Sequence, residues 1–167
     1  GEFLCDSPKL VEEALRHGAQ VVSLAVSDGV ALPEGVDASV RCVAVPPDVM
    51  ASISPVRTPQ GMLAACRMPD TALPERLTGQ RYVVLDGVQD PGNVGTLLRS
   101  AAAFGFDGVL LSDGCASVFA PKTLRASMGA AVRIPVIEAG KMPEAIALLR
   151  EKGITCLAAA LYQSQPL

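Results

Sequence analysis

The stretch Leu85–Gly105 reads LDGVQDPGNVGTLLRSAAAFG, and it predicts the end of a buried strand, a polar turn and a helix. Asp90 suits the cap of that helix and Pro91 suits its first position. We expect the free backbone amides of residues 92–94 to be able to meet an anion. In an open parallel sheet such a turn lies at the carboxyl edge of the strands, where ligands bind.

The apolar residues of the same helix predict which side of it is buried. At about 100° per residue, the buried stripe is formed by Val94, Leu97, Leu98 and Ala101. Arg99 lies about 200° around from Leu97 and therefore falls outside the stripe. We expect its guanidinium to reach solvent, or a phosphate near the mouth of the turn.

The residues that follow continue the alternation of strand and helix. Gly105, Gly129 and Gly153 mark the helix ends. Short apolar runs predict strands at 82–85, 109–111, 134–137 and 154–159. Amphipathic or proline-initiated runs predict helices at 91–104, 121–128 and 143–152. This order predicts an α/β fold with a parallel sheet and right-handed connections.

The residues before the motif predict a smaller unit. Ser7 and Pro8 open a helix that Gly18 ends, and the abrupt entry at residues 3–4 looks like the inside of a strand. Further strands are expected at 21–26, 40–45 and 61–65, with a short helix from 46 to 53. Two prolines within 69–74 predict a linker. We therefore expect a small α/β sandwich domain at 1–68, a linker at 69–80 and a second domain at 81–167.

Composition narrows the classes of function. Half of the residues are hydrophobic, so disorder is excluded, and no apolar run reaches the ~18–20 residues of a membrane span. The net charge is −3, with 6 basic against 10 acidic residues in 1–80 and 8 against 7 in 81–167. A broadly basic nucleic-acid binder is therefore excluded, although a local basic site is not.

Cysteines and sequence motifs give no sign of a metal or of other common cofactors. The five cysteines form no C-x-x-C pair, which predicts buried reduced thiols in a cytoplasmic protein and no metal site. There is no G-x-G-x-x-G after a strand, no phosphate-binding G-x-x-x-x-G-K-[ST] loop, no H-E-x-x-H and no G-x-S-x-G.

The whole 21-residue stretch resembles the first motif of the SpoU/TrmH RNA ribose methyltransferases of the SPOUT superfamily. That motif has an Asp-Pro-x-Asn turn, a glycine two residues on, an arginine and a small-residue helix that ends in Phe-Gly. Residues 121–130 (PKTLRASMGA) resemble the Arg-Ala-Ser-x-Gly segment of the family, and residues 58–61 (TPQG) resemble its Pro-Gln-Gly. The first domain resembles the ribosomal-protein-like RNA-binding domain that precedes many catalytic domains of the family.

This resemblance implies a function. Members transfer a methyl group from S-adenosylmethionine to a ribose 2′-hydroxyl of RNA and work as homodimers. With this kind of first domain the expected substrate is ribosomal RNA. Arg99 would be the catalytic arginine and Asn93 its neighbour. The residues expected to contact RNA are Arg125, Lys122, Ser127, Gln60 and Arg57. A free guanidinium is a poor base because its pKa exceeds ~12, so we expect Arg99 to orient a phosphate and stabilise developing alkoxide charge.

The chain departs from the family in its last residues. The second and third family motifs, which form most of the donor pocket and the C-terminal trefoil knot, do not follow residue 159. Only Ala160 and Leu161, at the end of the last expected strand, would touch the donor. We therefore expect a partial SPOUT domain without the knot, weak or no binding of S-adenosylmethionine by this chain, and an inactive piece of a longer enzyme.

Two other functions stay open at this point. The same fold could serve as an RNA-binding module without catalysis, which would show RNA affinity and no methyl transfer. A flavodoxin-like small-molecule domain would instead bind a nucleotide or flavin at residues 90–93, and RNA would not compete.

Overall fold

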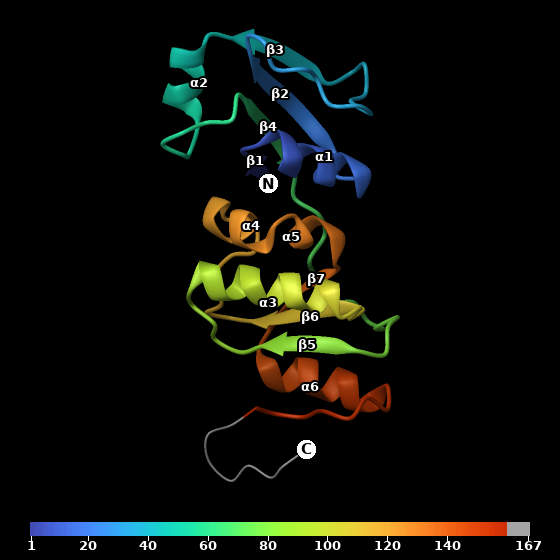
Figure 1. The fold of residues 1–167 in the computed structure, drawn as a ribbon. Helices are drawn as coiled ribbons and strands as arrows, with labels where there is room; N and C mark the ends of the chain where they lie inside the picture. The colour runs from blue at the N-terminus through green and yellow to red at the C-terminus, as the bar shows by residue number, and fades with distance from the viewer. Residues whose placement is uncertain (160–167) are drawn as a thin grey trace.

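A computed structural model describes residues 1–159, which form two α/β units that pack against each other (Figure 1). The N-terminal unit is built on a four-stranded sheet of order β1–β4–β2–β3. Strand β4 pairs antiparallel with both β1 and β2, while β3 pairs parallel with β2. Its elements are β1 (Glu2–Cys5), α1 (Pro8–Arg16), β2 (Val21–Ser27), β3 (Arg41–Val45), α2 (Pro47–Ile53) and β4 (Met62–Arg67).

The C-terminal unit is built on a parallel three-stranded sheet of order β5–β6–β7. Alternate residues of β6 point to opposite faces: Val109 and Leu111 pack with α3 on one face, and Leu110 packs with α6 on the other. The elements are β5 (Tyr82–Leu85), α3 (Pro91–Ala103), β6 (Gly108–Ser112), α4 (Pro121–Ser127), α5 (Ala130–Arg133), β7 (Val136–Gly140) and α6 (Met142–Glu151).

The α/β class and the parallel sheet are confirmed. Ser7 caps α1, since its hydroxyl accepts a hydrogen bond from the amide of Leu10 at 3.3 Å. The strand expected around residues 3–4 is confirmed as β1, which completes the first sheet. Two differences concern single elements: α5 is a short helix that the sequence pattern did not predict, and β7 begins two residues later than expected.

The strand predicted at residues 154–159 is wrong. These residues form no strand and are mostly exposed, with 76% of Leu157 accessible to solvent. An apolar run becomes a strand only where a neighbouring strand takes up its backbone groups. Within residues 1–159 this segment has no such partner.

The segment 69–80 is docked rather than loose. The amide of Glu138 donates to the carbonyl of Thr71 at 2.7 Å, and Ala72 forms a single parallel bridge with β7. Leu77 is 4% exposed within the core under α6, and the ammonium of Lys152 donates to its carbonyl. The segment thus covers the outer edge of β7, although its prolines predicted only a linker.

One hydrophobic core runs through both units. It includes Val11 of α1, Leu98 of α3 and Ala130 of α5, and the rings of Phe3 and Phe119 join the units with their centroids 4.9 Å apart. Figure 1 shows α4 and α5 between α1 above and α3 below. The two units therefore share apolar surface that neither could bury alone.

The cysteines follow the prediction in part. All five are free, but Cys42 and Cys156 are exposed. The predicted burial is therefore confirmed for Cys5 and Cys66. The sulfurs of these two lie 3.9 Å apart on β1 and β4, and this contact together with burial raises the pKa of Cys5. Among the helices of residues 1–159 none has the length and apolar character to cross a bilayer.

Candidate functional site

The turn at the carboxyl edge of the sheet is held by Asp90. Its Oδ1 accepts a hydrogen bond from the amide of Asn93 at 2.8 Å, and its carbonyl accepts one from Val94 at 3.0 Å. Asp90 as the cap of α3 and Pro91 as its first residue are both confirmed. The expected anion site is not confirmed, because the amides of Asn93 and Val94 already donate to Asp90. An N-cap satisfies the same groups that an anion would need.

A second set of contacts fastens this turn to the next loop. The hydroxyl of Ser112, at the end of β6, donates to Oδ1 of Asp86 at 2.7 Å and accepts from the amide of Gly87 at 2.9 Å. The thiol of Cys115 lies 3.3 Å from the amide of Val88. These polar groups satisfy one another, so the turn is fixed before any ligand arrives.

Helix α3 passes unusually close to α4 at Gly95. A Cβ added there would lie 2.5 Å from the Cβ of Ala126, 2.8 Å from the amide nitrogen of Ser127 and 2.8 Å from the carbonyl oxygen of Thr123. Two of these atoms are backbone and cannot move aside. The buried stripe is therefore Val94, Gly95, Leu98 and Ala101, and the prediction that Leu97 is buried is wrong, since 36% of it is exposed.

Arg99 lies away from the turn. It lies six positions after Asn93, which corresponds to a rise of about 9 Å along the helix. Its side chain is exposed and lines a hollow of about 330 Å³ with Arg133, Phe106 and Pro135. Within residues 1–159 it forms no ion pair. The structure thus places Asn93 at the turn and Arg99 in a separate hollow that Arg133 also lines.

The basic residues predicted to contact RNA lie on both units. Lys122 lies beside the turn, with its Nζ 3.8 Å from Oδ2 of Asp90. Arg125 crosses to the N-terminal unit, where its Nη1 donates to the buried Oδ2 of Asp6 at 2.5 Å. Gln60 lines the same interdomain cleft as Arg125, and Arg57 is exposed in the loop between α2 and β4. Part of the guanidinium of Arg125 therefore serves the contact between the units.

Ser127 does not fit a role in RNA contact. Its side chain is fully buried; the hydroxyl donates to the carbonyl of Leu124 at 2.8 Å and accepts from the amide of Ala131 at 3.3 Å. It links the end of α4 to the start of α5, and it is not part of the proposed RNA surface.

The residue after Ser127 has a strained backbone. Met128 has φ +52° and ψ +40°, and it is the one non-glycine residue with positive φ in residues 1–159. This left-handed conformation costs about 1–2 kcal/mol in a residue with a Cβ. Gly129 follows with φ +85°, and its missing side chain leaves room for Cγ of Glu13, which would lie 3.1 Å from an added Cβ.

The residues that the structure describes do not by themselves fit a methyl-donor pocket. Ala160 and Leu161, the predicted donor contacts, lie outside the described residues. The polar groups at the carboxyl edge are bonded to one another, as described above. A cavity of about 760 Å³ lies elsewhere, at the amino edge of the sheet against the segment 69–80, and it includes Tyr82 and Pro135. In the described part of the chain no three His, Cys, Asp or Glu residues are grouped to hold a metal ion.

Two family models match the chain. The model described as the SpoU rRNA Methylase family matches residues 80–167. The model described as the MRM3-like substrate binding domain matches residues 1–64. Together the two matches cover nearly all of the chain.

A curated relative is the 23S rRNA (guanosine(2553)-2'-O)-methyltransferase RlmP of Bacillus subtilis, which is 35% identical over 164 residues. The alignment covers 98% of this chain and 64% of that protein. The chain therefore spans just under two thirds of the length of this relative.

Solved structures agree in fold. The SpoU methyltransferase AviRb from Streptomyces viridochromogenes, in complex with AdoMet, superposes with a TM-score of 0.77 at 25% identity, covering 92% of this chain and 61% of that one. A putative RNA methyltransferase of the TrmH family from Porphyromonas gingivalis gives a TM-score of 0.74 at 35% identity, covering 92% and 60%.

Proposed function

Because the chain belongs to the SpoU rRNA methylase family, we propose that the protein carrying it transfers a methyl group from S-adenosylmethionine to a ribose 2′-hydroxyl of ribosomal RNA. The proposal is supported by RlmP, a 23S rRNA 2′-O-methyltransferase. Its alignment with this chain covers 98% of the chain. The structural observation that carries it is Arg99, an exposed arginine without an ion pair in the described residues, on a helix whose start is already fixed.

Arg99 acts in this proposal as the group that orients the RNA. Arg133 also lines this hollow, but its Nε lies 3.8 Å from Oε2 of Glu13, so the cation left to attract a phosphate here is Arg99. A guanidinium bound to the phosphate beside the target ribose holds the 2′-oxygen in place and stabilises the negative charge that develops on it.

The RNA surface in this proposal extends from the turn to the N-terminal unit. Asn93 presents an exposed side-chain amide at the start of α3, and Lys122 lies beside it on α4. Arg125, Gln60 and Arg57 continue the surface across the interdomain cleft. Three of these groups, Lys122, Arg125 and Arg57, are local cations in a chain of net charge −3, so binding relies on placed contacts rather than on a uniform positive field.

The donor enters this proposal only through the relatives, since AviRb was solved with AdoMet bound. When bound, the donor supplies the methyl group. The described residues do not form its site, and we derive no step of the reaction through it. We expect calorimetric titration of S-adenosylmethionine into the 167-residue chain to show no binding; clear micromolar binding would mean that residues considered incidental here build the pocket.

Three further expectations belong to the same proposal. We propose that the working protein is a homodimer, that it acts in the cytoplasm where ribosomal RNA is available, and that the domain boundaries lie at residues 68 and 81. The resemblance to the SpoU/TrmH family supports the first, the five free cysteines support the second, and the two separate sheets support the third.

The test is a methyl-transfer assay on ribosomal RNA with the natural protein that carries this chain. We expect Arg99→Ala to lower kcat by about 10²–10³-fold, the usual loss when a group that stabilises transition-state charge is removed. Arg150→Ala, which removes an exposed arginine from α6, is the matched control and should leave kcat unchanged. If Arg99→Lys retained near-normal turnover, two-point orientation by the guanidinium would be the wrong mechanism.

A second candidate function is RNA binding without catalysis. The observation that favours it is the turn itself, whose amides are taken up by Asp90 rather than left open. In that case the protein would bind ribosomal RNA, Arg99→Ala would weaken binding only, and no 2′-O-methyl group would be found in the RNA by alkaline hydrolysis.

A further inference from the structure

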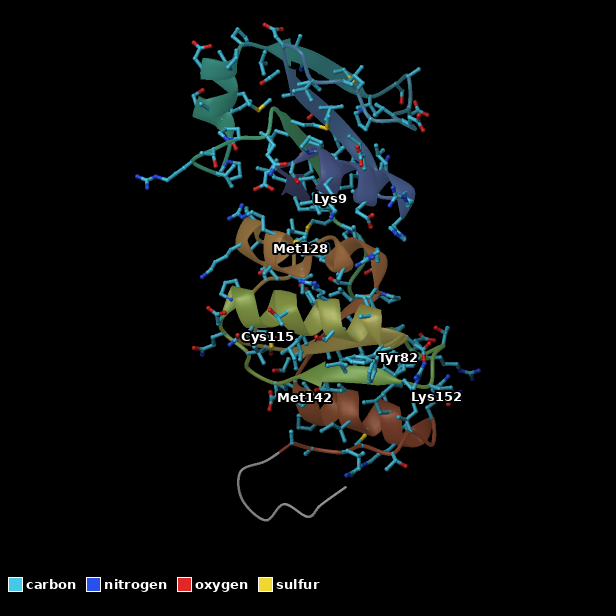
Figure 2. All side chains as sticks on the ribbon, in the orientation of Figure 1. Lys9, Tyr82, Cys115, Met128, Met142 and Lys152 are labelled. Atoms are coloured by element: carbon cyan, nitrogen blue, oxygen red, sulfur yellow. The ribbon has the colours of Figure 1, made fainter. Side chains whose placement is uncertain are left out.

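A cleft between the two units lies outside the motif that suggested the function. It has a volume of about 370 Å³, within the range of small-ligand sites. Figure 2 shows Lys9, on α1, and Met128, after α4, at the boundary between the units. Both residues line the cleft, together with Thr58 and Gln60 from the loop before β4 and with Leu124 at its base.

Met128 is the unusual feature of this cleft. Its backbone is held in the left-handed region, which asparagine or glycine would adopt more readily. Burial of its side chain does not offset that strain, because half of the residue is exposed to solvent. Backbone strain combined with an exposed apolar side chain indicates a ligand contact rather than a core residue. A thioether is also well suited to lie against an aromatic ring.

The charges of the cleft favour an anion at one end. The two acidic residues that line it are already compensated: Asp6 by Arg125, and Glu13 by Arg16, with Arg133 and His17 within 4 Å. Lys9 is exposed and forms no ion pair within residues 1–159. The cleft therefore offers one available ammonium, one exposed thioether and the polar side chains of Thr58 and Gln60.

We propose that this cleft binds one unstacked nucleotide of the RNA, with its base against Met128, the edge of the base on Gln60 and Thr58, and its phosphate on Lys9. The inference rests on the proposed function, since it takes RNA as the substrate. Proteins read RNA sequence mostly from unstacked bases, and glutamine offers a donor and an acceptor to a base edge. Helix α4 joins the two sites, because Lys122 at its start lies beside Asp90 and Met128 follows its end.

The test uses the methyl signals of the five methionines, labelled with ¹³C, in the full chain. Each of the four ribonucleoside 5′-monophosphates is titrated in turn, with inorganic phosphate as a separate probe. We expect the Met128 signal to move upfield and to saturate with at least one nucleotide, and not with phosphate. The Met142 signal, on α6, should stay in place. Lys9→Ala should weaken the nucleotide affinity about tenfold, the effect of losing one charged hydrogen bond.

A second variant separates binding from folding. Met128→Asn keeps the left-handed backbone at lower strain and removes the thioether. We expect its thermal midpoint to equal or exceed that of the wild type, while its affinity for a single-stranded RNA oligonucleotide, measured by fluorescence anisotropy, falls. Equal affinity for the oligonucleotide in both proteins would overturn the proposal.

The remaining outcomes distinguish this inference from the function on which it rests. If the oligonucleotide binds but no nucleotide moves the Met128 signal, the cleft is not the base site and the RNA function stands. If neither binds, both fail. If the Met128 signal moves but the natural protein methylates no ribosomal RNA, the cleft stands and the proposed reaction fails.

Discussion

The two ends of α3 differ in what surrounds them. At its start Asp90 caps the helix, and Gly95 lies against the backbone of α4. Towards its end Leu97, Arg99 and Phe104 are exposed, and 75% of Phe104 is accessible to solvent. The start of the helix is therefore fixed by its cap and by close packing, whereas several side chains towards its end reach solvent. Variants in the two halves should fail in different ways.

The largest effect on stability is expected at the close approach of α3 and α4. Gly95→Ala gains about 1 kcal/mol of helix propensity. The added Cβ would meet two backbone atoms of α4 at 2.8 Å, and the resulting strain outweighs that gain. We expect a net loss of about 2 kcal/mol in the free energy of unfolding, measured by urea denaturation.

Thr96→Ala is the matched control for this variant, because Thr96 is the exposed neighbour of Gly95. Its stability should stay within about 0.5 kcal/mol of the wild type. If Gly95→Ala were as stable as this control, the start of α3 would not be fixed by packing, and the contrast between its two ends would disappear.

A smaller effect is expected at the cap. Asp90→Ala should lower the free energy of unfolding by about 1 kcal/mol, because the amide of Asn93 loses its acceptor. Asp90→Asn keeps an acceptor and should recover most of this loss. Equal losses in the two variants would instead point to the charge of Asp90 and to its contact with Lys122, which lies 3.8 Å away.

The smallest effect concerns Asp107, just after the end of α3. Hydrogen bonds from the amides of Gln80 and Arg81 lower the pKa of this carboxyl. Since the folded pKa lies below the unfolded one, the stabilisation is present above about pH 4 and is lost as the pH falls through the folded pKa. In Asp107→Asn the thermal midpoint should fall slightly less than in the wild type as the pH is lowered from about pH 5 to about pH 2. An unchanged profile would show that these hydrogen bonds do not persist in solution.

The sequence allowed the cap and the order of strands and helices to be predicted, because these depend on local patterns. Asp90, Pro91 and the alternation of apolar runs needed no knowledge of the neighbours. The position of the buried stripe on α3 depended on the partner: helical periodicity placed Leu97 inside, but a glycine allows a closer approach than leucine, so Gly95 became the contact. No local pattern shows how near a second helix will come.

The other corrections concern which hydrogen-bond partners particular groups find in the fold. Ser127 reads as a polar residue in an RNA-binding segment, yet its hydroxyl is used between two helices. The amides of Asn93 and Val94 read as an anion site, yet the residue that starts the helix occupies them. Residues 154–159 have strand-like composition, but within residues 1–159 no neighbouring strand pairs with them. Only in this last case does the deciding group lie elsewhere in the chain. For Ser127 and for the turn, the bonding partners lie within four residues along the same segment.

The core shared by the two units has a consequence for synthesis. A growing chain emerges from its N-terminus, and a unit can bury its apolar surface only when the covering residues exist. Phe3 is made before Phe119 and Ala130, which lie on the other side of the same core and come more than a hundred residues later. During that interval the apolar side chains of β1 and α1 that later pack against α4 and α5 are uncovered, and it is there that a chaperone would find this nascent protein.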